Sequence, residues 1–277
     1  MKRVLKRIGN YILHGVPNLK IEVVQKTSQE MFESKKILIT GGGRGLGFYI
    51  AKKCIAEGAE VIITGKNEET LKKAVKDLGE KARYVVFDIC DISNIEKYFK
   101  KCIDIFGRID CVVSNAGISL HENTITNVTL EGFDEQINVN LRGGYFLAQE
   151  YIKYYEKNKL ERGNIIFISS ERGDQCDQIP YGLTKAAINS LTKGLARKYY
   201  SKGIKVNAVA PGVTVSDMTN LKKEDNMYCT YNSSKRYFMP EEVAEVVAFL
   251  ISDNSNCISG EVIHTNTGNH LRPWWND

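Results

Sequence analysis

Short apolar runs alternate with longer amphipathic segments along most of this chain. From residue 35 onward, runs rich in β-branched residues are separated by stretches such as 46–57, 68–78 and 180–200, in which apolar residues recur at helical spacing. This alternation is typical of parallel strands joined by crossover helices. The predicted strands span residues 36–40, 60–64, 82–87, 111–114, 164–169, 205–210 and 262–265.

Two of the predicted strands, which contain IIFIS and KVNAVA, are nearly continuous in apolar residues. Such runs are expected where helices cover both faces of a sheet. We therefore predict an α/β fold built on a doubly wound, seven-stranded parallel sheet. The length of 277 residues suits a single domain, because α/β folds routinely reach that size as one unit.

Residues 1–34 precede the first predicted strand and form a basic N-terminal extension to the predicted domain at 35–277. Apolar residues between Val4 and Leu13 can share one helical face, beside basic residues at positions 2, 3, 6 and 7. We expect an arm that packs on the domain or stabilises an oligomer. A peripheral contact with a membrane surface is the alternative.

Residues 217–238 form a polar, tyrosine-containing stretch after the sixth predicted strand. Ligands of open α/β sheets bind outside the carboxyl ends of the strands, so a long insertion at that edge is well placed to cover one. We predict a substrate lid, with an ordinary surface loop as the alternative.

Charge and cysteine content narrow the range of partners. The net charge of +5 comes from 38 basic and 33 acidic residues spread along the chain, which is too mild to indicate nucleic acid. The seven cysteines form no C-x-x-C pair, and an odd number cannot close completely into disulfides. With no apolar run of the roughly 18 to 20 residues that a membrane span needs, we expect a cytoplasmic protein without stable membrane insertion. The histidines and cysteines show no metal-ligand spacing, so no metal is expected.

A glycine-rich segment follows the first predicted strand directly and leads into a predicted helix. It departs from the G-x-G-x-x-G spacing but supplies glycines for close backbone approach and a helix N-terminus that favours an anion. A tight structural turn is the alternative, and the position after the first strand favours dinucleotide binding. The candidate cofactor-binding residues here are Gly41, Gly43, Arg44, Gly45, Leu46 and Gly47.

The second predicted strand indicates which dinucleotide is bound. Sites that choose NAD usually place an acid about 20 residues after the glycine loop, on the ribose 2′-hydroxyl. Here no acid stands at the strand tip, and Lys66 follows instead. Together with Arg44, Lys66 can pair with a 2′-phosphate, so we expect NADP(H) in preference to NAD(H).

Tyr181 and Lys185 are spaced i, i+4 on a predicted helix and so lie on one face. A neighbouring ammonium favours the phenolate, which makes proton exchange by a tyrosine more accessible near neutral pH. We expect Tyr181 to act as general acid in reduction and as base in oxidation. Alone, such a pair is often a solvated helix face, but Ser170 at the end of the preceding strand favours the catalytic interpretation.

In this order the motifs resemble those of the classical short-chain dehydrogenase/reductase family, and the resemblance extends over residues 35–268. Its markers are Thr40-Gly41-x-x-x-Gly45-x-Gly47, Asp88, Ser114-Asn115-Ala116-Gly117, Asn140, Ser170, Tyr181-x-x-x-Lys185, Asn207 and Pro211-Gly212. The resemblance implies a Rossmann fold and an NADP(H)-dependent oxidoreductase that moves a hydride between the nicotinamide and a carbonyl or secondary alcohol of a small substrate. It also implies a homo-oligomer, a dimer or tetramer.

The same resemblance assigns roles to individual residues. It implies that Ser170 hydrogen-bonds the substrate oxygen, that Lys185 also holds the nicotinamide ribose, and that Asn140 holds a water connecting Lys185 to solvent. The further cofactor contacts that it implies are Asp88, Ile89, Asn115, Ala116, Gly117, Tyr181, Lys185, Pro211, Gly212 and Val213.

Some positions depart from the family's pattern. Ser114 stands where relatives have a first asparagine, the interval from Ser170 to Tyr181 is short, and Ser169 is a neighbouring candidate for the Ser170 role. Residues 265–268 replace an Asp-Gly-Gly turn. The charged residues at 171–175 suggest a polar or charged substrate, unless they pair with one another or face a partner subunit.

Two other functions stay open on the sequence. One is an NADP(H)-binding sensor or scaffold without turnover, and the other is a nucleotide-sugar epimerase or dehydratase, which shares the Tyr-x-x-x-Lys pair. Because both Tyr181 and Lys185 are retained, the sequence favours turnover.

Overall fold

In the part of the chain that the structure describes, seven parallel strands form one sheet in the order β3-β2-β1-β4-β5-β6-β7. The structure is a computed structural model, and it describes residues 31–222, 226–229 and 232–271. The strands are β1 (Lys36–Thr40), β2 (Glu60–Gly65), β3 (Ala82–Val86), β4 (Cys111–Ser114), β5 (Gly163–Ile168), β6 (Ile204–Pro211) and β7 (Val262–Thr265). The predicted doubly wound sheet is confirmed, and the observed strand ends differ from the predicted ones by one residue at most.

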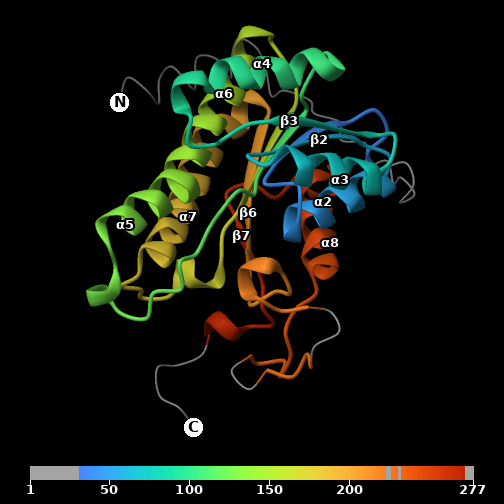
Figure 1. Cartoon of the computed structure of the whole chain (residues 1–277). Coiled ribbons are helices and arrows are strands. Elements are labelled where there is room, and N and C mark those ends of the chain that lie inside the picture. The colour runs from blue at the N-terminus through green and yellow to red at the C-terminus, as the bar shows by residue number, and fades with distance from the viewer. Residues whose placement is uncertain (1–30, 223–225, 230–231, 272–277) are drawn as a thin grey trace, which may run out of the picture.

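Helices cover both faces of this sheet (Figure 1). One layer contains α2 (Gly45–Ala56), α3 (Glu68–Leu78) and α8 (Pro240–Ile251), and the other contains α4 (Ile95–Phe106), α6 (Gly144–Lys157) and α7 (Pro180–Tyr199). A short helix, α5 (Leu130–Ile137), leads into α6 through a π-helical turn. Both faces of the strands are therefore buried, which explains their continuous apolar runs.

Alternate residues of each central strand enter opposite cores. In β1, Ile37 and Ile39 pack against α2, α3 and α8, whereas Leu38 packs with the layer that contains α6 and α7. This division follows from the two-residue period of a strand. Because β1 lies between β2 and β4, the sheet order reverses beside β1, and the crevice at the carboxyl ends of β1 and β4 is where ligands of such sheets bind.

The described parts of residues 217–238 lie beyond the carboxyl ends of β6 and β7, at the bottom of Figure 1. Bridges at Thr214↔Phe238 and Tyr228↔Arg236 connect this segment to the loop after β6 and to itself. The location agrees with a lid, whose function stays a prediction. Of the N-terminal extension, residues 1–30 lie outside the described residues, while Phe32 is fully buried and its N–H donates to the Glu57 carbonyl.

None of the helices in the described ranges combines the length and the apolar character that a membrane crossing requires.

Candidate functional site

The glycine loop between β1 and α2 leaves little room for side chains. A Cβ on Gly47 would overlap the carbonyl of Gly41 and approach the Asn115 amide to 2.5 Å, and Gly41 has a positive φ of 64°. Arg44 is the N-cap of α2, but its side chain makes no capping hydrogen bond. The first N–H groups of α2 are therefore available to an anion, and the bare backbone suits the close approach of a pyrophosphate.

Asn115 joins the glycine loop to the end of β4. Its Nδ2 donates to the carbonyls of Thr40 at 2.9 Å and Gly41 at 3.1 Å. In return, the backbone N–H groups of Asn115 and Ala116 each donate to Thr40 Oγ1 at 3.1 Å. These markers, 75 residues apart in sequence, thus form one wall of the site. Thr40 was not among our predicted site residues, although its position at a strand end before glycines is a usable signal.

Replacement of the usual first asparagine by Ser114 leaves this wall intact. Asn115 makes all the side-chain contacts to the glycine loop described above. Ser114 Oγ lies instead on the side of α6, where a Cβ on Gly144 would come within 2.9 Å of it.

The three proposed catalytic side chains meet at the junction of β5 and α7. Lys185 is almost fully buried, its Nζ donates to the Ile168 carbonyl at 2.8 Å, and the same nitrogen lies 5.5 Å from the centroid of the Tyr181 ring. Burial raises the pKa of Tyr181, while a hydrogen bond with Ser170 and the charge of Arg172 lower it. Burial also lowers the pKa of Lys185 to about 8. The net effect keeps the pKa of Tyr181 above its ordinary value, so this side chain is protonated at neutral pH and can act as a proton donor, whereas the pKa of Lys185 lies closer to neutral.

The neighbouring serine, Ser169, makes different contacts from those of Ser170. Ser169 Oγ donates to Asn189 Oδ1 at 2.5 Å and to the Lys185 carbonyl at 3.3 Å, so it is committed to α7. Ser170 Oγ faces Tyr181 and accepts the Arg172 N–H at 3.3 Å. The geometry supports Ser170 over Ser169 as the group that contacts substrate.

Asn140 lies in the π-helical turn Asn138–Gly143 between α5 and α6. Its Oδ1 accepts the Ile118 N–H at 2.8 Å, and its Nδ2 donates to the Ile118 carbonyl at 2.9 Å. A Cβ on Gly117 would lie 3.4 Å from Asn140 Oδ1 and 3.5 Å from Lys185 Nζ. The structure thus brings Gly117, Asn140 and Lys185 together, as a shared proton path would require, and the water-holding role of Asn140 stays a proposal.

The remaining predicted cofactor residues surround the same crevice. Asp88 follows β3, where its Oδ1 accepts the Cys90 N–H at 2.9 Å, and buried Ile89 lies against Gly143. At the end of β6, the Gly212 N–H donates to the Thr265 carbonyl at 3.3 Å and the Val213 carbonyl accepts the Phe238 N–H at 3.0 Å. All of them lie at the carboxyl edge of the sheet, together with Leu46, Pro211 and the rest of the glycine loop.

Both predicted 2′-phosphate ligands lie at the outer rim of the glycine loop. Arg44 is largely exposed, with Nη1 3.3 Å from Asp217 Oδ2 in the predicted lid. Lys66 is exposed just after β2. A Cβ on Gly43 would lie 3.1 Å from Thr70 Cγ2 in the first turn of α3, so the glycine loop adjoins the segment that carries Lys66. The position fits a phosphate on the adenosine ribose.

The charged segment after Ser170 forms a 3-10 turn, η5 (Glu171–Asp174), whose side chains have partners within the chain. Buried Glu171 accepts hydrogen bonds from Asn266 at 2.9 Å and Asn269 at 3.1 Å. Asp174 accepts from Asn189 Nδ2 at 2.9 Å and lies 2.6 Å from His264 Nε2. These contacts agree with our alternative that the charges pair internally, so they do not by themselves indicate a charged substrate.

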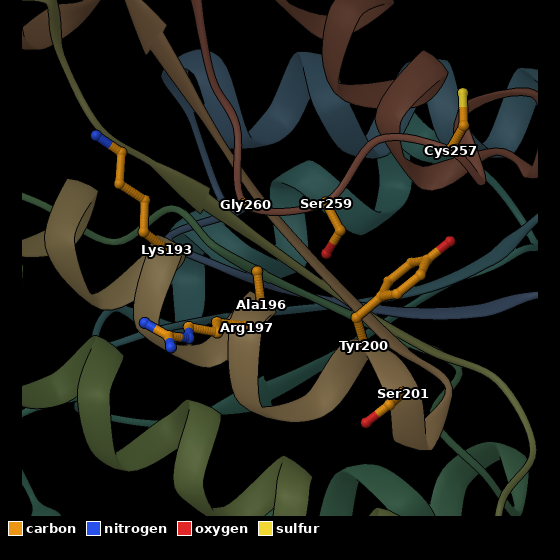
Figure 2. Close-up of a pocket in the computed structure, with 8 residues that line it drawn as sticks. All are labelled: Lys193, Ala196, Arg197, Tyr200, Ser201, Cys257, Ser259 and Gly260. Atoms are coloured by element: carbon orange, nitrogen blue, oxygen red, sulfur yellow. The ribbon is translucent and has the colours of Figure 1, made fainter. Parts of the chain in front are cut away.

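Two hollows lie away from these residues. One cavity of about 480 Å³ lies between the C-terminal half of α7 and the loop before β7, and is lined by Lys193, Ala196, Arg197, Tyr200, Ser201, Cys257, Ser259 and Gly260 (Figure 2). Another, of about 470 Å³, opens at the amino ends of the strands beside Lys35 and Lys205. Neither cavity is lined by a predicted site residue. Within the described residues, no group of three His, Cys, Asp or Glu side chains is placed to hold a metal ion.

Comparisons with known proteins match nearly the whole described chain. The model of the family described as enoyl-(acyl carrier protein) reductase matches residues 41–270. The 3-oxoacyl-[acyl-carrier-protein] reductase FabG of Aquifex aeolicus (strain VF5) is 35% identical over 244 residues, which cover 85% of this chain and 97% of the relative. The enzyme of the same name from Rickettsia bellii (strain RML369-C) is 38% identical over 235 residues, covering 83% of this chain and 95% of the relative.

Comparison with solved structures gives matches of the same kind. The 3-ketoacyl-(acyl-carrier-protein) reductase from Brucella melitensis, complexed with NADH, superimposes with a TM-score of 0.79 at 27% identity, covering 86% of this chain and 99% of that one. A levodione reductase gives a TM-score of 0.80 at 30% identity, with coverage of 87% and 100%. A short-chain type dehydrogenase/reductase from Mycobacterium ulcerans gives 0.79 at 28% identity, with coverage of 87% and 91%.

Proposed function

Since this chain belongs to the short-chain dehydrogenase/reductase family and is thus an oxidoreductase of carbonyl and alcohol groups, we propose that it reduces the ketone of a 3-oxoacyl thioester with NADPH. The observation that carries the proposal is the contact between Ser170, Tyr181 and Lys185 beside an open glycine loop. The thioester substrate is suggested by the names of the 3-oxoacyl reductases, which the chain covers almost completely.

The chain's residues suit a dinucleotide. Gly41 and Gly47 leave backbone space that a Cβ would fill, and the uncapped first turn of α2 can receive the pyrophosphate. Asp88, Ile89, Asn115, Ala116 and Gly117, with the loop at residues 211–213, would hold the adenine and nicotinamide ends. When bound, NADPH supplies the hydride that adds to the carbonyl carbon.

The remaining steps belong to the protein. Ser170 Oγ donates a hydrogen bond to the carbonyl oxygen and stabilises the negative charge that develops there. Tyr181 gives its phenolic proton to the same oxygen, so that the ketone becomes a secondary alcohol. The Lys185 ammonium, 5.5 Å from the Tyr181 ring, favours the phenolate left behind, and Asn140 would position the water through which a proton returns.

An assay on the full-length protein tests this function. NADPH absorbance would be followed with acetoacetyl-CoA as the 3-oxoacyl probe, crotonyl-CoA as the enoyl probe, and levodione as a ketone without a thioester. We expect turnover of acetoacetyl-CoA at least about ten times faster in kcat/KM than either other probe, because thioester recognition adds binding energy remote from the ketone. Turnover of crotonyl-CoA alone would reject ketone reduction, and NADPH binding without any turnover would favour the sensor or scaffold.

Cofactor choice is a separate prediction. Removing both charges with Arg44→Ala and Lys66→Ala is expected to lower kcat/KM for NADPH by about tenfold or more, since each charge-assisted contact to a phosphate contributes roughly 1.5 to 3 kcal/mol before solvent screening. The kcat/KM for NADH should stay within about twofold, because NADH has no 2′-phosphate.

Lys97→Ala, which removes an exposed charge from α4, is the control for that double variant. Equal losses with NADPH and NADH would contradict recognition of a 2′-phosphate by these residues.

We also propose that copies of this chain associate with one another. Exposed apolar side chains lie on the helices that flank Asn140 and on the helix that carries Tyr181: Leu130 and Phe133 on α5, Tyr145 on α6 and Leu183 on α7. Such residues suit an interface between copies of the chain, which supports a homo-oligomer.

A further inference from the structure

A second cation lies beside the Tyr181 ring. Arg172 belongs to η5, and its Cζ is 6.0 Å from the ring centroid, while Lys185 Nζ on α7 is 5.5 Å from the same centroid. Cations at this range from an aromatic ring interact favourably with it, and more strongly when the ring carries negative charge. The proton-donating side chain of the proposed mechanism therefore has positive charge from two elements of the fold.

Asp177 holds Arg172 in this place. Arg172 Nη2 lies 2.7 Å from Asp177 Oδ1 and 2.6 Å from Oδ2, and the Asp177 side chain is only 7% exposed. Asp177 Oδ1 also accepts the Ile179 N–H at 2.9 Å, immediately before α7 begins. A Cβ on Gly182 would overlap the Asp177 carboxylate, so the glycine after Tyr181 makes room for this anchor. The guanidinium is thus tied to the helix that carries Tyr181.

The charges around Tyr181 act in both directions. Burial and the carboxylate of Glu171 raise the pKa of Tyr181, whereas the Ser170 hydrogen bond and Arg172 lower it. Glu171 is itself held by Asn266 and Asn269. The Asp177 carboxylate partly offsets Arg172, and Lys185 contributes its own positive charge.

We propose that Arg172 is a positioning residue for the reduction, and that its guanidinium, anchored by Asp177, stabilises the phenolate that Tyr181 becomes when it protonates the substrate. This inference rests on the proposed function. In the step, the Tyr181 O–H bond breaks, its proton passes to the carbonyl oxygen, and the hydride from NADPH adds to the carbonyl carbon, leaving an alcohol and NADP⁺. The Tyr181 phenolate then persists beside Arg172 and Lys185 until a proton returns from solvent.

The pH profile of kcat/KM for ketone reduction tests this proposal. Reduction requires protonated Tyr181, so activity falls as pH rises through the pKa of this group. In Arg172→Gln the alkaline limb should move to higher pH by about 0.5 to 1 unit, because a partly screened charge about 6 Å away no longer favours the phenolate. Arg172→Lys keeps the positive charge, so its alkaline limb should shift by no more than about half as much as that of Arg172→Gln.

Alcohol oxidation gives an independent readout of the same group. There Tyr181 must be ionised, and the rising limb in Arg172→Gln should move to higher pH in parallel with the reduction limb. Arg108→Gln is the matched control, since it removes an arginine that pairs with Asp110 at the opposite end of the sheet. Both limbs of the Arg108→Gln profiles should lie at the same pH as in the unaltered protein.

Asp177→Asn keeps the proposal testable if Arg172→Gln fails to fold. The asparagine Oδ1 can still accept both the Ile179 N–H and a hydrogen bond from Arg172 Nη2, so the guanidinium keeps its place. The loss of the negative charge that offsets Arg172 should then move the limb to lower pH. Limbs unchanged in Arg172→Gln, or shifted equally in Arg172→Gln and Arg172→Lys, would overturn the proposal; so would an unchanged limb in Asp177→Asn. Absence of ketone reduction in the unaltered protein would instead reject the proposed function.

Discussion

Tyr181→Phe is expected to lower kcat for ketone reduction by about 10³-fold and to leave the Kd for NADPH within about twofold. Phenylalanine keeps the ring that packs beside Arg172 and Lys185 but has no proton to give. The Ser170 hydroxyl would remain to polarise the carbonyl, which is why some turnover should persist. The measurement is steady-state NADPH oxidation, with cofactor binding followed by NADPH fluorescence.

Tyr200→Phe provides the comparison for Tyr181→Phe. Tyr200 directly follows the other end of the same helix, and its hydroxyl donates to the Asn256 carbonyl at 2.7 Å, so the variant also loses one phenolic hydrogen bond. It should retain kcat within about twofold, because the lost bond contributes only roughly 1 kcal/mol to stability. If Tyr181→Phe kept more than a tenth of the activity, Tyr181 would not be the proton donor.

Gly47→Ala is expected to weaken NADPH binding by about 100-fold and to destabilise the fold by roughly 1 to 3 kcal/mol. The added Cβ would overlap the Gly41 carbonyl and press on the Asn115 amide that holds the glycine loop to β4. Both obstacles belong to the wall of the cofactor site, so relief of the overlap must move the loop. Fluorescence titration with NADPH and thermal unfolding measure the two effects.

The matched substitution is Gly194→Ala on α7, where a Cβ meets nothing within 4 Å. Alanine is the better helix former by about 0.8 to 1 kcal/mol, so this variant should bind NADPH normally and unfold at the same or a higher temperature. Normal NADPH affinity in Gly47→Ala would show that the glycine loop does not form the cofactor site.

Local pattern was sufficient to predict the sheet. Each strand of the core is an apolar run, and each crossover helix carries an apolar stripe, so the alternation along the chain is preserved in the folded order. The ends of elements depend on more than local pattern. For example, β6 extends one residue beyond the predicted run on each side, because its end residues pair with β5 and β7. Such pairing depends on neighbours that a single run does not reveal.

The candidate site was predictable where residues are close in sequence. Tyr181 and Lys185 share a helix face by their spacing, and the glycine loop lies beside a helix N-terminus by its order in the chain. Lys66 at the tip of β2 followed from the same reasoning. The proposed experiments test which ligand each of these groups binds.

By itself, the sequence determined the layered sheet, the glycine loop and the face shared by Tyr181 and Lys185, because periodicity and spacing are local properties of the chain. Only the tertiary structure decided which serine faces Tyr181 and where the charges after Ser170 go. Glu171 accepts a hydrogen bond from Asn266, which is 95 positions away in sequence, and Ser169 donates one to Asn189, which is 20 positions away. Those choices depend on side-chain directions and on the burial of polar groups, which must find partners among whatever the folded elements bring near.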